Sequence, residues 1–390
     1  MNTPNRLIEL ATVFLKLGII GFGGPAAHIA MMEDEVVTRR AWMERSQFLD
    51  LVGATNLIPG PNSTEMAIHI GYLYAGLPGL MIAGICFILP AVIITGILAW
   101  MYQTYGNLPQ VIPLLYGIKP VVIAVIFNAL WRLGKKAVKS RKLLLIGIAV
   151  MGLCLLGIDE IVALLMGGIV GMIWLVLLPN QPTSSMILGG LGLNLALAGS
   201  TVTTATVTPN LWQLGLFFLK VGSVLFGSGY VLFAFLEGQL VGAYHWLTQQ
   251  QLLDAIAVGQ FTPGPVLSTS TFIGYQILGI PGAIVATIGI FLPSFIFVLI
   301  LNPLIPKLRQ SKWTGAFLDA VNVSSVALMV IVTLRLSQTV IFKSSGRLPI
   351  DIAAILITLI SAVLLVRYRL NAAWLVLGGA AIGLVIQVNS

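Results

Sequence analysis

The fold is decided by a short stretch that occurs twice, Pro59-Gly60-Pro61-Asn62-Ser63-Thr64 and Pro263-Gly264-Pro265-Val266-Leu267-Ser268. Proline removes a backbone hydrogen-bond donor and clashes with the preceding turn, and glycine tolerates non-helical angles. Each copy therefore predicts a break between two helices. The apolar segments beside the first copy, 46–58 and 62–74, are too short to cross a bilayer singly. We expect them to form a re-entrant hairpin.

The two stretches close a longer internal repeat. Residues 14–61 align with 218–265 at a constant offset of 204, and sixteen of the forty-eight positions are identical. After one deletion the match continues through Leu89-Pro90 and Leu292-Pro293. Shared hydrophobicity would not reproduce lysine, glutamate, tryptophan and aspartate in register, so the pattern indicates a duplication.

The composition is that of a membrane protein. Of 390 residues, 58% are hydrophobic and 9% are charged, and the mean hydropathy is +0.99. A soluble domain uses about a quarter of its residues as Asp, Glu, Lys and Arg. We therefore expect an all-α polytopic membrane protein with roughly 9–12 membrane helices, broken or re-entrant at the Gly-rich and Pro-Gly-Pro motifs.

Loop charges predict that the halves have inverted topology. The loop at 38–45 carries three arginines, and its counterpart at 242–249 carries no Lys or Arg; the bias reverses at 102–109. Equivalent loops thus prefer opposite sides, and the basic loop at 132–142 is expected in the cytoplasm. We divide the chain into a first transport repeat (1–180), a linker with a connecting membrane segment (181–210) and a second, inverted repeat (211–390). Whether 7–32 spans or folds back stays open.

A glycine break also recurs in both halves, and together with the Pro-Gly-Pro motifs it predicts the substrate site. The helix after each motif points free N–H groups and its positive dipole end at the break, which suits an anion. A single break is more often a packing kink, but two matched copies favour a transport site. The substrate-binding candidates are Gly23, Gly24, Pro25, Pro59, Gly60, Pro61, Asn62, Ser63, Thr64, Gly227, Ser228, Gly229, Pro263, Gly264, Pro265, Ser268 and Thr269.

Charged residues in apolar surroundings complete the prediction. Lys16 and Lys220 occupy matched positions before the glycine breaks and are candidates for attracting an anion, although Lys16 could instead extend to the membrane interface. Lys119 is a third candidate, with Asn322 as its counterpart. Glu33 and Glu237 are matched acids that either carry protons for coupled transport or form ion pairs. For the matched Asp50 and Asp254, a structural role is favoured.

Other functions are disfavoured. Cys86 and Cys154 lie in apolar runs, and the three histidines show no ligand spacing, so we expect no metal and no cofactor. The sequence contains no phosphate-binding loop and no arrangement of a nucleophile and a base, so we do not expect an enzyme. The net charge of +8 resides in short loops, and we expect no nucleic-acid partner. A homodimer is left open.

Over residues 7–388 the chain resembles the chromate ion transporter family in its long, two-domain form. The resemblance rests on Phe14-Leu15-Lys16-Leu17-Gly18, Gly21-Phe22-Gly23-Gly24-Pro25, both Pro-Gly-Pro motifs and Gly117-Ile118-Lys119-Pro120. It implies export of chromate from the cytoplasm, with sulfate as an analogue, and thus chromate resistance at the cytoplasmic (inner) membrane. The second half departs from the pattern, because Ser228-Gly229 replaces Gly24-Pro25. Alternatives are a secondary carrier for another small anion and a passive anion channel; an intramembrane enzyme is the weaker class.

Overall fold

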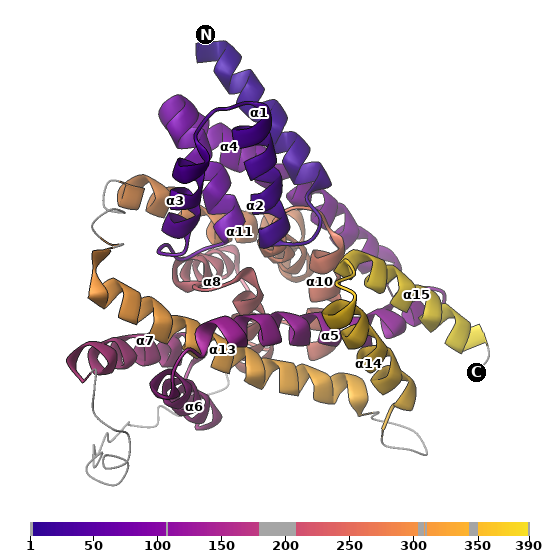
Figure 1. The fold of residues 1–390 in the computed structure, drawn as a ribbon. Coiled ribbons are helices and arrows are strands. Elements are labelled where there is room, and N and C mark those ends of the chain that lie inside the picture. The colour runs from indigo at the N-terminus through magenta and orange to yellow at the C-terminus, as the bar shows by residue number, and fades with distance from the viewer. Residues whose placement is uncertain are drawn as a thin grey trace.

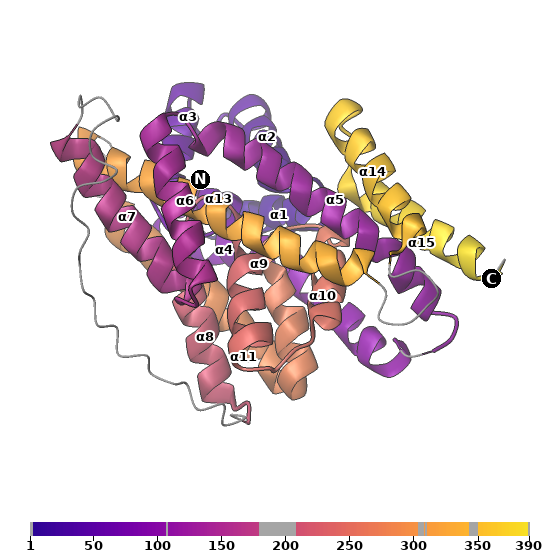
Figure 2. The same ribbon diagram turned by 90° about the horizontal axis from the view of Figure 1, so that it is seen from below.

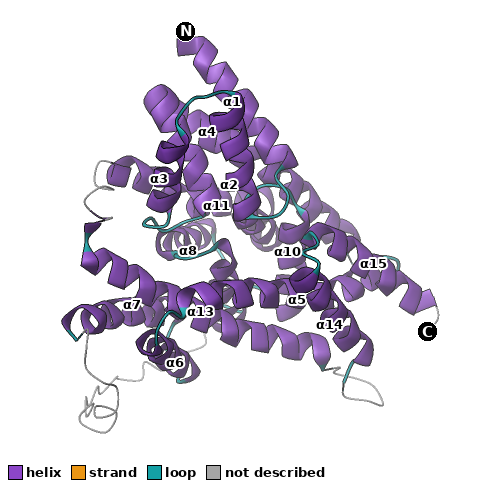
Figure 3. Ribbon diagram, viewed as in Figure 1, coloured by secondary structure: helices purple, strands orange, loops and turns teal. Residues whose placement is uncertain are grey.

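The computed structural model describes residues 3–106, 108–178, 208–302, 308, 310–342 and 350–388. Within these ranges the chain is helical and forms no strand, apart from one isolated bridge between Phe342 and Ile350 (Figure 3). The all-α prediction is confirmed. The predicted connecting segment at 186–200 lies outside the described residues.

The first half contains a series of helices interrupted at the predicted breaks. Its elements are α1 (Thr3–Ile20), α2 (Pro25–Glu33), η1 (Asp34–Arg39), α3 (Arg45–Thr55), α4 (Asn62–Tyr105), α5 (Ile112–Ala137), α6 (Arg141–Leu155) and α7 (Glu160–Leu177). The glycine break separates α1 from α2, and the Pro-Gly-Pro motif separates α3 from α4. Both breaks lie where the sequence predicts them.

The second half repeats this order. Its elements are α8 (Leu211–Val224), η2 (Gly229–Val231), α9 (Leu232–Phe235), η3 (Leu236–Ala243), α10 (Gln249–Phe261), η4 (Val266–Ser268), α11 (Thr269–Leu301), α13 (Lys312–Ile341), α14 (Ile352–Arg367) and α15 (Ala372–Val388). Polar caps mark several helix starts, among them Thr248, whose side chain forms a capping box with Gln251 at the start of α10.

Each long helix that follows a Pro-Gly-Pro motif consists of two helical segments joined at a sharp kink. In α4 the backbone leaves helical geometry at Ala75 and Gly76, and in α11 at Leu278 and Gly279. Both glycines have a positive φ, 65° and 64°, which a residue with a side chain rarely adopts. The same sharp kink at equivalent positions confirms that the two halves share one architecture.

The halves exchange their last helices. α5 runs beside α13 at the centre, but α6 and α7 of the first half pack on α13, whereas α14 and α15 of the second half pack on α5 (Figures 1 and 2). The kinked helices α4 and α11 also pack on each other. The repeats are therefore intertwined rather than placed side by side.

Five segments are long and apolar enough to cross a membrane: 62–105, 112–137, 160–177, 266–301 and 312–341. Four shorter apolar helices accompany them within the described residues. Many large apolar side chains on these helices are exposed, including Ile97, Trp100, Ile284 and Ile288. An exposed apolar surface on this scale fits lipid and not water, and the protein is a multi-pass membrane protein.

Candidate functional site

The four breaks meet at the centre of the molecule through backbone hydrogen bonds that cross between the halves. The Gly60 N–H of the first Pro-Gly-Pro donates to the carbonyl of Leu225 at the second-half glycine break, at 2.7 Å. The Gly264 N–H of the second motif donates to the carbonyl of Gly21 at the first-half break, at 2.8 Å. Each half thus completes the interrupted backbone of the other, as non-helical backbone inside a membrane requires.

Side chains add further links among the breaks. His28 Nε2 lies 2.8 Å from the same Gly21 carbonyl, and the Tyr230 hydroxyl donates to Gln260 at 3.3 Å, just before the second Pro-Gly-Pro. A Cβ built on Gly24 would lie 3.9 Å from that tyrosine hydroxyl, so the two glycine breaks are neighbours. The predicted motif residues are therefore brought together in space.

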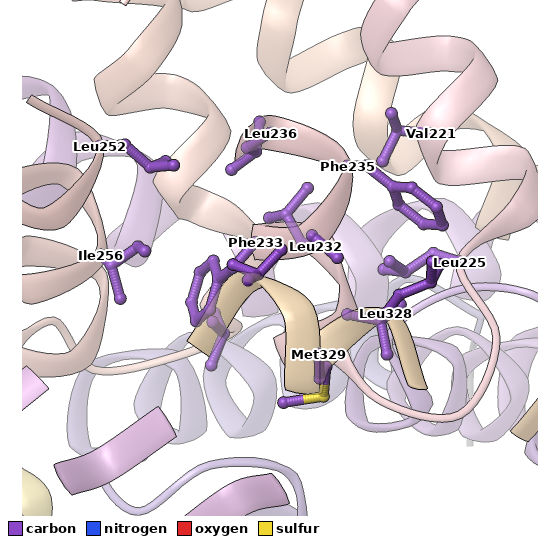
Figure 4. Close-up of a cluster of buried hydrophobic side chains, with 14 of the residues drawn as sticks. Val221, Leu225, Leu232, Phe233, Phe235, Leu236, Leu252, Ile256, Leu328 and Met329 are labelled. Atoms are coloured by element: carbon purple, nitrogen blue, oxygen red, sulfur yellow. The ribbon is translucent and has the colours of Figure 1, made fainter. Parts of the chain in front are cut away.

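The second-half break is anchored in the main hydrophobic core. Leu225 lies among Val221, Leu232, Phe235 and Leu328 (Figure 4). The first-half break is anchored in a smaller core that contains Phe14, Met32 and Phe87. Rigid packing holds the interrupted backbone in place, which is what a preformed binding site needs.

Several buried polar side chains near the two motifs have no hydrogen-bond partner among the residues that the structure describes. A buried polar group without a partner costs about 1–3 kcal/mol, so such groups are normally satisfied or reserved for a ligand. These side chains lie in the first turns after the Pro-Gly-Pro motifs or further along α11: Thr64, Glu65, Ser268, Ser270 and Ser294. Of the predicted hydroxyl donors, Thr64 and Ser268 are thus available to a bound molecule, whereas the Thr269 hydroxyl donates to the carbonyl of Val266 at 2.8 Å.

A polar cavity of about 220 Å³ reaches the motifs from one side. It is lined by Asn56 and Asn62 beside the first Pro-Gly-Pro, by Gly227 of the second glycine break, and by Asn322 and Ser325 on α13. Lys136, in the last turn of α5, and Lys139, between α5 and α6, lie at its wall together with Asp319, which pairs with Lys139 at 2.6 Å. Two lysines and one aspartate leave the wall with an excess of positive charge, which attracts anions.

The equivalent region on the other side is filled by an ion pair. Lys119 Nζ lies 3.4 Å from Asp254 Oδ1, and the Tyr102 hydroxyl donates to Asp254 Oδ2 at 2.9 Å. The Asp254 side chain is 4% exposed and that of Lys119 20%. The structure therefore places Lys119 against a carboxylate, whereas its counterpart Asn322 lines the open cavity.

The remaining predicted charges lie away from the breaks. Lys16 is half exposed and pairs with Glu35 at 2.6 Å, and its ammonium holds the pKa of that carboxyl below the usual value. Lys220 is exposed on α8. Glu33 pairs with Arg45 at 2.9 Å, and Glu237 pairs with Arg335 at 2.8 Å.

Several groups at the site carry no motif in the sequence that would predict them. The carbonyls of Gly21 and Leu225 are hydrogen-bond partners that no side-chain motif marks. Ser294 directly follows Pro293, which the repeat matches to Pro90, so that proline pair was the available signal. From the sequence, Lys136 counts only as one of the basic residues of 132–142 that indicate the cytoplasmic side, and not as part of the site.

Comparison with known proteins identifies the family of this chain. The family model described as "Chromate transporter" matches residues 8–172 and 212–384, one segment in each half. The chain belongs to the chromate transporter family. It is accordingly a membrane transporter and not an enzyme. No solved structure matches the chain.

Three members of this family from bacteria align over most of their length. The chain is 32% identical to the chromate transport protein of Cupriavidus metallidurans, covering 97% of this chain and 93% of that protein. It is 34% identical to the probable chromate transport protein of Synechococcus elongatus, covering 82% and 81%. It is 32% identical to the chromate transport protein of Pseudomonas aeruginosa, covering 86% and 82%.

Proposed function

We propose that this transporter exports chromate from the cytoplasm across the inner membrane, and that sulfate fits the same site. The observation that carries the proposal is the pair of crossed hydrogen bonds, Gly60 to Leu225 and Gly264 to Gly21. They hold two interrupted helices beside one another with their first turns buried. Chromate and sulfate are tetrahedral dianions, and backbone N–H groups, hydroxyls and helix N-termini recognise such ions.

By alternating access, the site would open first to one side of the membrane and then to the other. The cavity at Asn56 and Gly227 is open, whereas the region of Lys119 and Asp254 is closed. Because the cavity lies beside the basic loop at 132–142, the positive-inside rule assigns its mouth to the cytoplasm. A state open to the cytoplasm is the one that an exporter loads.

The direct test is transport of labelled chromate into inverted membrane vesicles, with and without a proton gradient. We expect saturable uptake that the gradient or the membrane potential changes and that unlabelled sulfate inhibits. The same assay on Lys16→Ala and Lys220→Ala tests their predicted role in attracting the anion, which unchanged transport in both variants would remove. Uptake that neither saturates nor responds to a gradient would indicate a passive channel. Inhibition by carboxylates but not by sulfate would indicate a different small anion.

Alternating access can be tested by cysteine labelling at one matched pair of positions. Asn56 lines the cavity, and its repeat counterpart Gln260 has a buried amide nitrogen without a partner. In a background with Cys86 and Cys154 replaced by alanine, Asn56→Cys should react with an impermeant maleimide from the cytoplasmic side. Gln260→Cys should react only from the opposite side, and faster during turnover. Equal reaction of both from one side would contradict the mechanism.

A further inference from the structure

Glu65 is the most unusual charged residue in the molecule. It lies in the first turn of α4, is 0% exposed, and neither carboxyl oxygen has a hydrogen-bond partner among the described residues. It faces the first Pro-Gly-Pro, because a Cβ on Gly60 would lie 2.3 Å from Glu65 Oε1 and 2.5 Å from Ser294 Oγ. The repeat places no acid at the equivalent position in the second half.

Within the described part of the chain, no charged group forms an ion pair with this carboxyl. The helices that pack on α4 are chiefly α1 and α11, with fewer contacts from α2, α3 and α10. Their charged and titratable groups have other partners or lie at the surface: Arg6 on Tyr74, Glu9 on Arg40, Lys16 on Glu35, His28 on Gly21, Glu33 on Arg45, Asp254 on Lys119, and the exposed Asp50. Partly buried Tyr275 lies on α11, and on α4 itself His69 is buried one turn beyond Glu65, with both ring nitrogens unpartnered.

The other membrane acids differ from Glu65. Glu33 and Glu237 each have an arginine partner, and Asp254 has both Lys119 and Tyr102. An isolated carboxylate taken out of water is far more costly than one with a partner, so burial without a partner favours the protonated form of the carboxyl over the ionised form. A carboxyl of this kind is a place where a proton binds and leaves.

We propose that Glu65 is a proton-binding group of the transporter, and that it takes up its proton together with the anion. An ionised Glu65 would occupy the positive end of α4 and repel a dianion from it, whereas the protonated acid leaves that end free. One O–H bond forms on Glu65 as one O–H bond of a hydronium ion or water molecule from the solution breaks, and the cavity by which the proton would arrive extends to Asn62, three residues away. The inference rests on the proposed anion transport at the first-half motif.

The pairing of the two ions determines the charge that moves. A dianion carried with one proton transfers a single net negative charge, which a membrane potential negative inside drives outward. By linkage, the proton raises the affinity for the anion by the same factor as the anion raises the affinity for the proton.

The wild-type protein tests the sign of this coupling. Chromate is added to purified transporter in a weakly buffered solution at mildly alkaline pH with an indicator dye, and a protein-free blank is subtracted. We expect proton uptake, approaching one proton for each chromate bound. Proton release, or chromate binding without any proton change, would overturn the proposal, and this result does not depend on the folding of a variant.

Variants identify the residue. In vesicles, wild-type KM for chromate should rise by up to about tenfold per pH unit over the range in which Glu65 loses its proton. Glu65→Gln, which copies the protonated acid, should abolish that slope and hold KM near the wild-type value at acidic pH. The matched control is Glu44→Gln, an exposed acid at the start of α3, which should keep the slope.

Three results would refute the assignment to Glu65. In the first, the pH slope of KM persists in Glu65→Gln. In the second, the slope is lost in Glu33→Gln or Glu237→Gln instead. In the third, it is lost in His69→Gln while Glu65→Gln keeps it. If the wild-type protein carries no chromate at all, the proposed function fails, and that outcome is distinct from transport that continues without the predicted pH slope.

Discussion

The helices α3 and α10 occupy equivalent places in the two repeats and have opposite environments. α10 is buried along most of its length, begins with a capping box, and holds Asp254 against Lys119 and Tyr102. α3 has no side-chain cap at its N-cap residue Glu44, and its matched Asp50 is exposed. The matched aspartate of the duplicated segment is therefore buried in the second half, as Asp254, and exposed in the first half, as Asp50. The two repeats, which are related by duplication, therefore place their equivalent helices α3 and α10 in different environments.

Under the proposed alternating access, this difference would let one scaffold open to either side of a membrane. Where α10 is packed against α5, a buried ion pair fills the region between them. Where α3 stands apart from α13, the cavity at Asn322 opens to the motifs. If the repeats exchanged positions, the open and closed regions would exchange as well, which is the behaviour that inverted repeats permit.

The largest expected effect comes from the motif glycines. Gly60 has φ 143°, and a Cβ there would also collide with Glu65 and Ser294; Gly264 has φ 88°, and its Cβ would meet Ala91 at 2.9 Å. Strain plus overpacking of about 3 kcal/mol predicts that Gly60→Ala loses chromate flux by about a hundredfold. For Gly264→Ala, strain plus a shallower overlap, 2.9 Å instead of 2.3 Å, predicts a smaller loss, of more than about tenfold.

The control for both variants is Gly96→Ala, at a helical position in α4 with open space around the added methyl. Vesicle flux should be close to wild type. Equal loss in the two motif variants would show that the motifs are interchangeable, and wild-type flux in both would reduce them to packing kinks.

A smaller effect is expected at the matched aspartates. Asp254→Asn leaves Lys119 without its partner and should lower the free energy of unfolding by about 3 kcal/mol, the low end for breaking a buried pair because Lys119 is 20% exposed. Asp50→Asn should change it by less than about 0.5 kcal/mol, since the side chain is at the surface. Thermal unfolding of the purified proteins in detergent measures both.

Replacing both members of the ion pair by apolar residues checks whether an unpaired Lys119 causes the loss of stability in Asp254→Asn. The double variant Lys119→Met, Asp254→Leu should recover much of the lost stability, because no buried charge is left unpaired. Similar destabilisation by Asp50→Asn would mean that the two aspartates share one environment, contrary to the comparison of α3 with α10.

The smallest effect should distinguish the wall of the cavity from its surroundings. Lys136 lines the cavity, whereas its neighbour Lys135 lies over the ring of Trp131, 4.6 Å from the centroid. Lys136→Gln should raise KM for chromate by about two- to threefold at low ionic strength and not at high ionic strength, because steering by exposed charge is screened. Lys135→Gln should leave KM unchanged; an equal change in both would point to a general surface effect.

Much of the fold was predictable because its signals are local. The scarcity of charge, the breaks at Gly23 and Gly60, and the register of the duplication follow from short-range chemistry and composition. The site was predictable only in its backbone motifs. The lysine predictions assumed that a cation in an apolar run faces the breaks, yet Lys16 meets Glu35 and Lys119 meets Asp254. Neither partner can be read from a position along the chain.

By itself, the sequence determined that this is a duplicated membrane protein with paired helix breaks, since proline, glycine and hydrophobicity act on neighbouring residues. Only the tertiary structure decided that each Pro-Gly-Pro bonds to the other half's glycine break, that the last helices are exchanged, and that Glu65 is buried without a partner. These are contacts between residues far apart in the sequence: Gly60 and Leu225 are 165 positions apart, and Gly264 and Gly21 are 243 apart. They depend on which helices pack together, and identical motifs such as those around Asp50 and Asp254 acquire different environments for that reason.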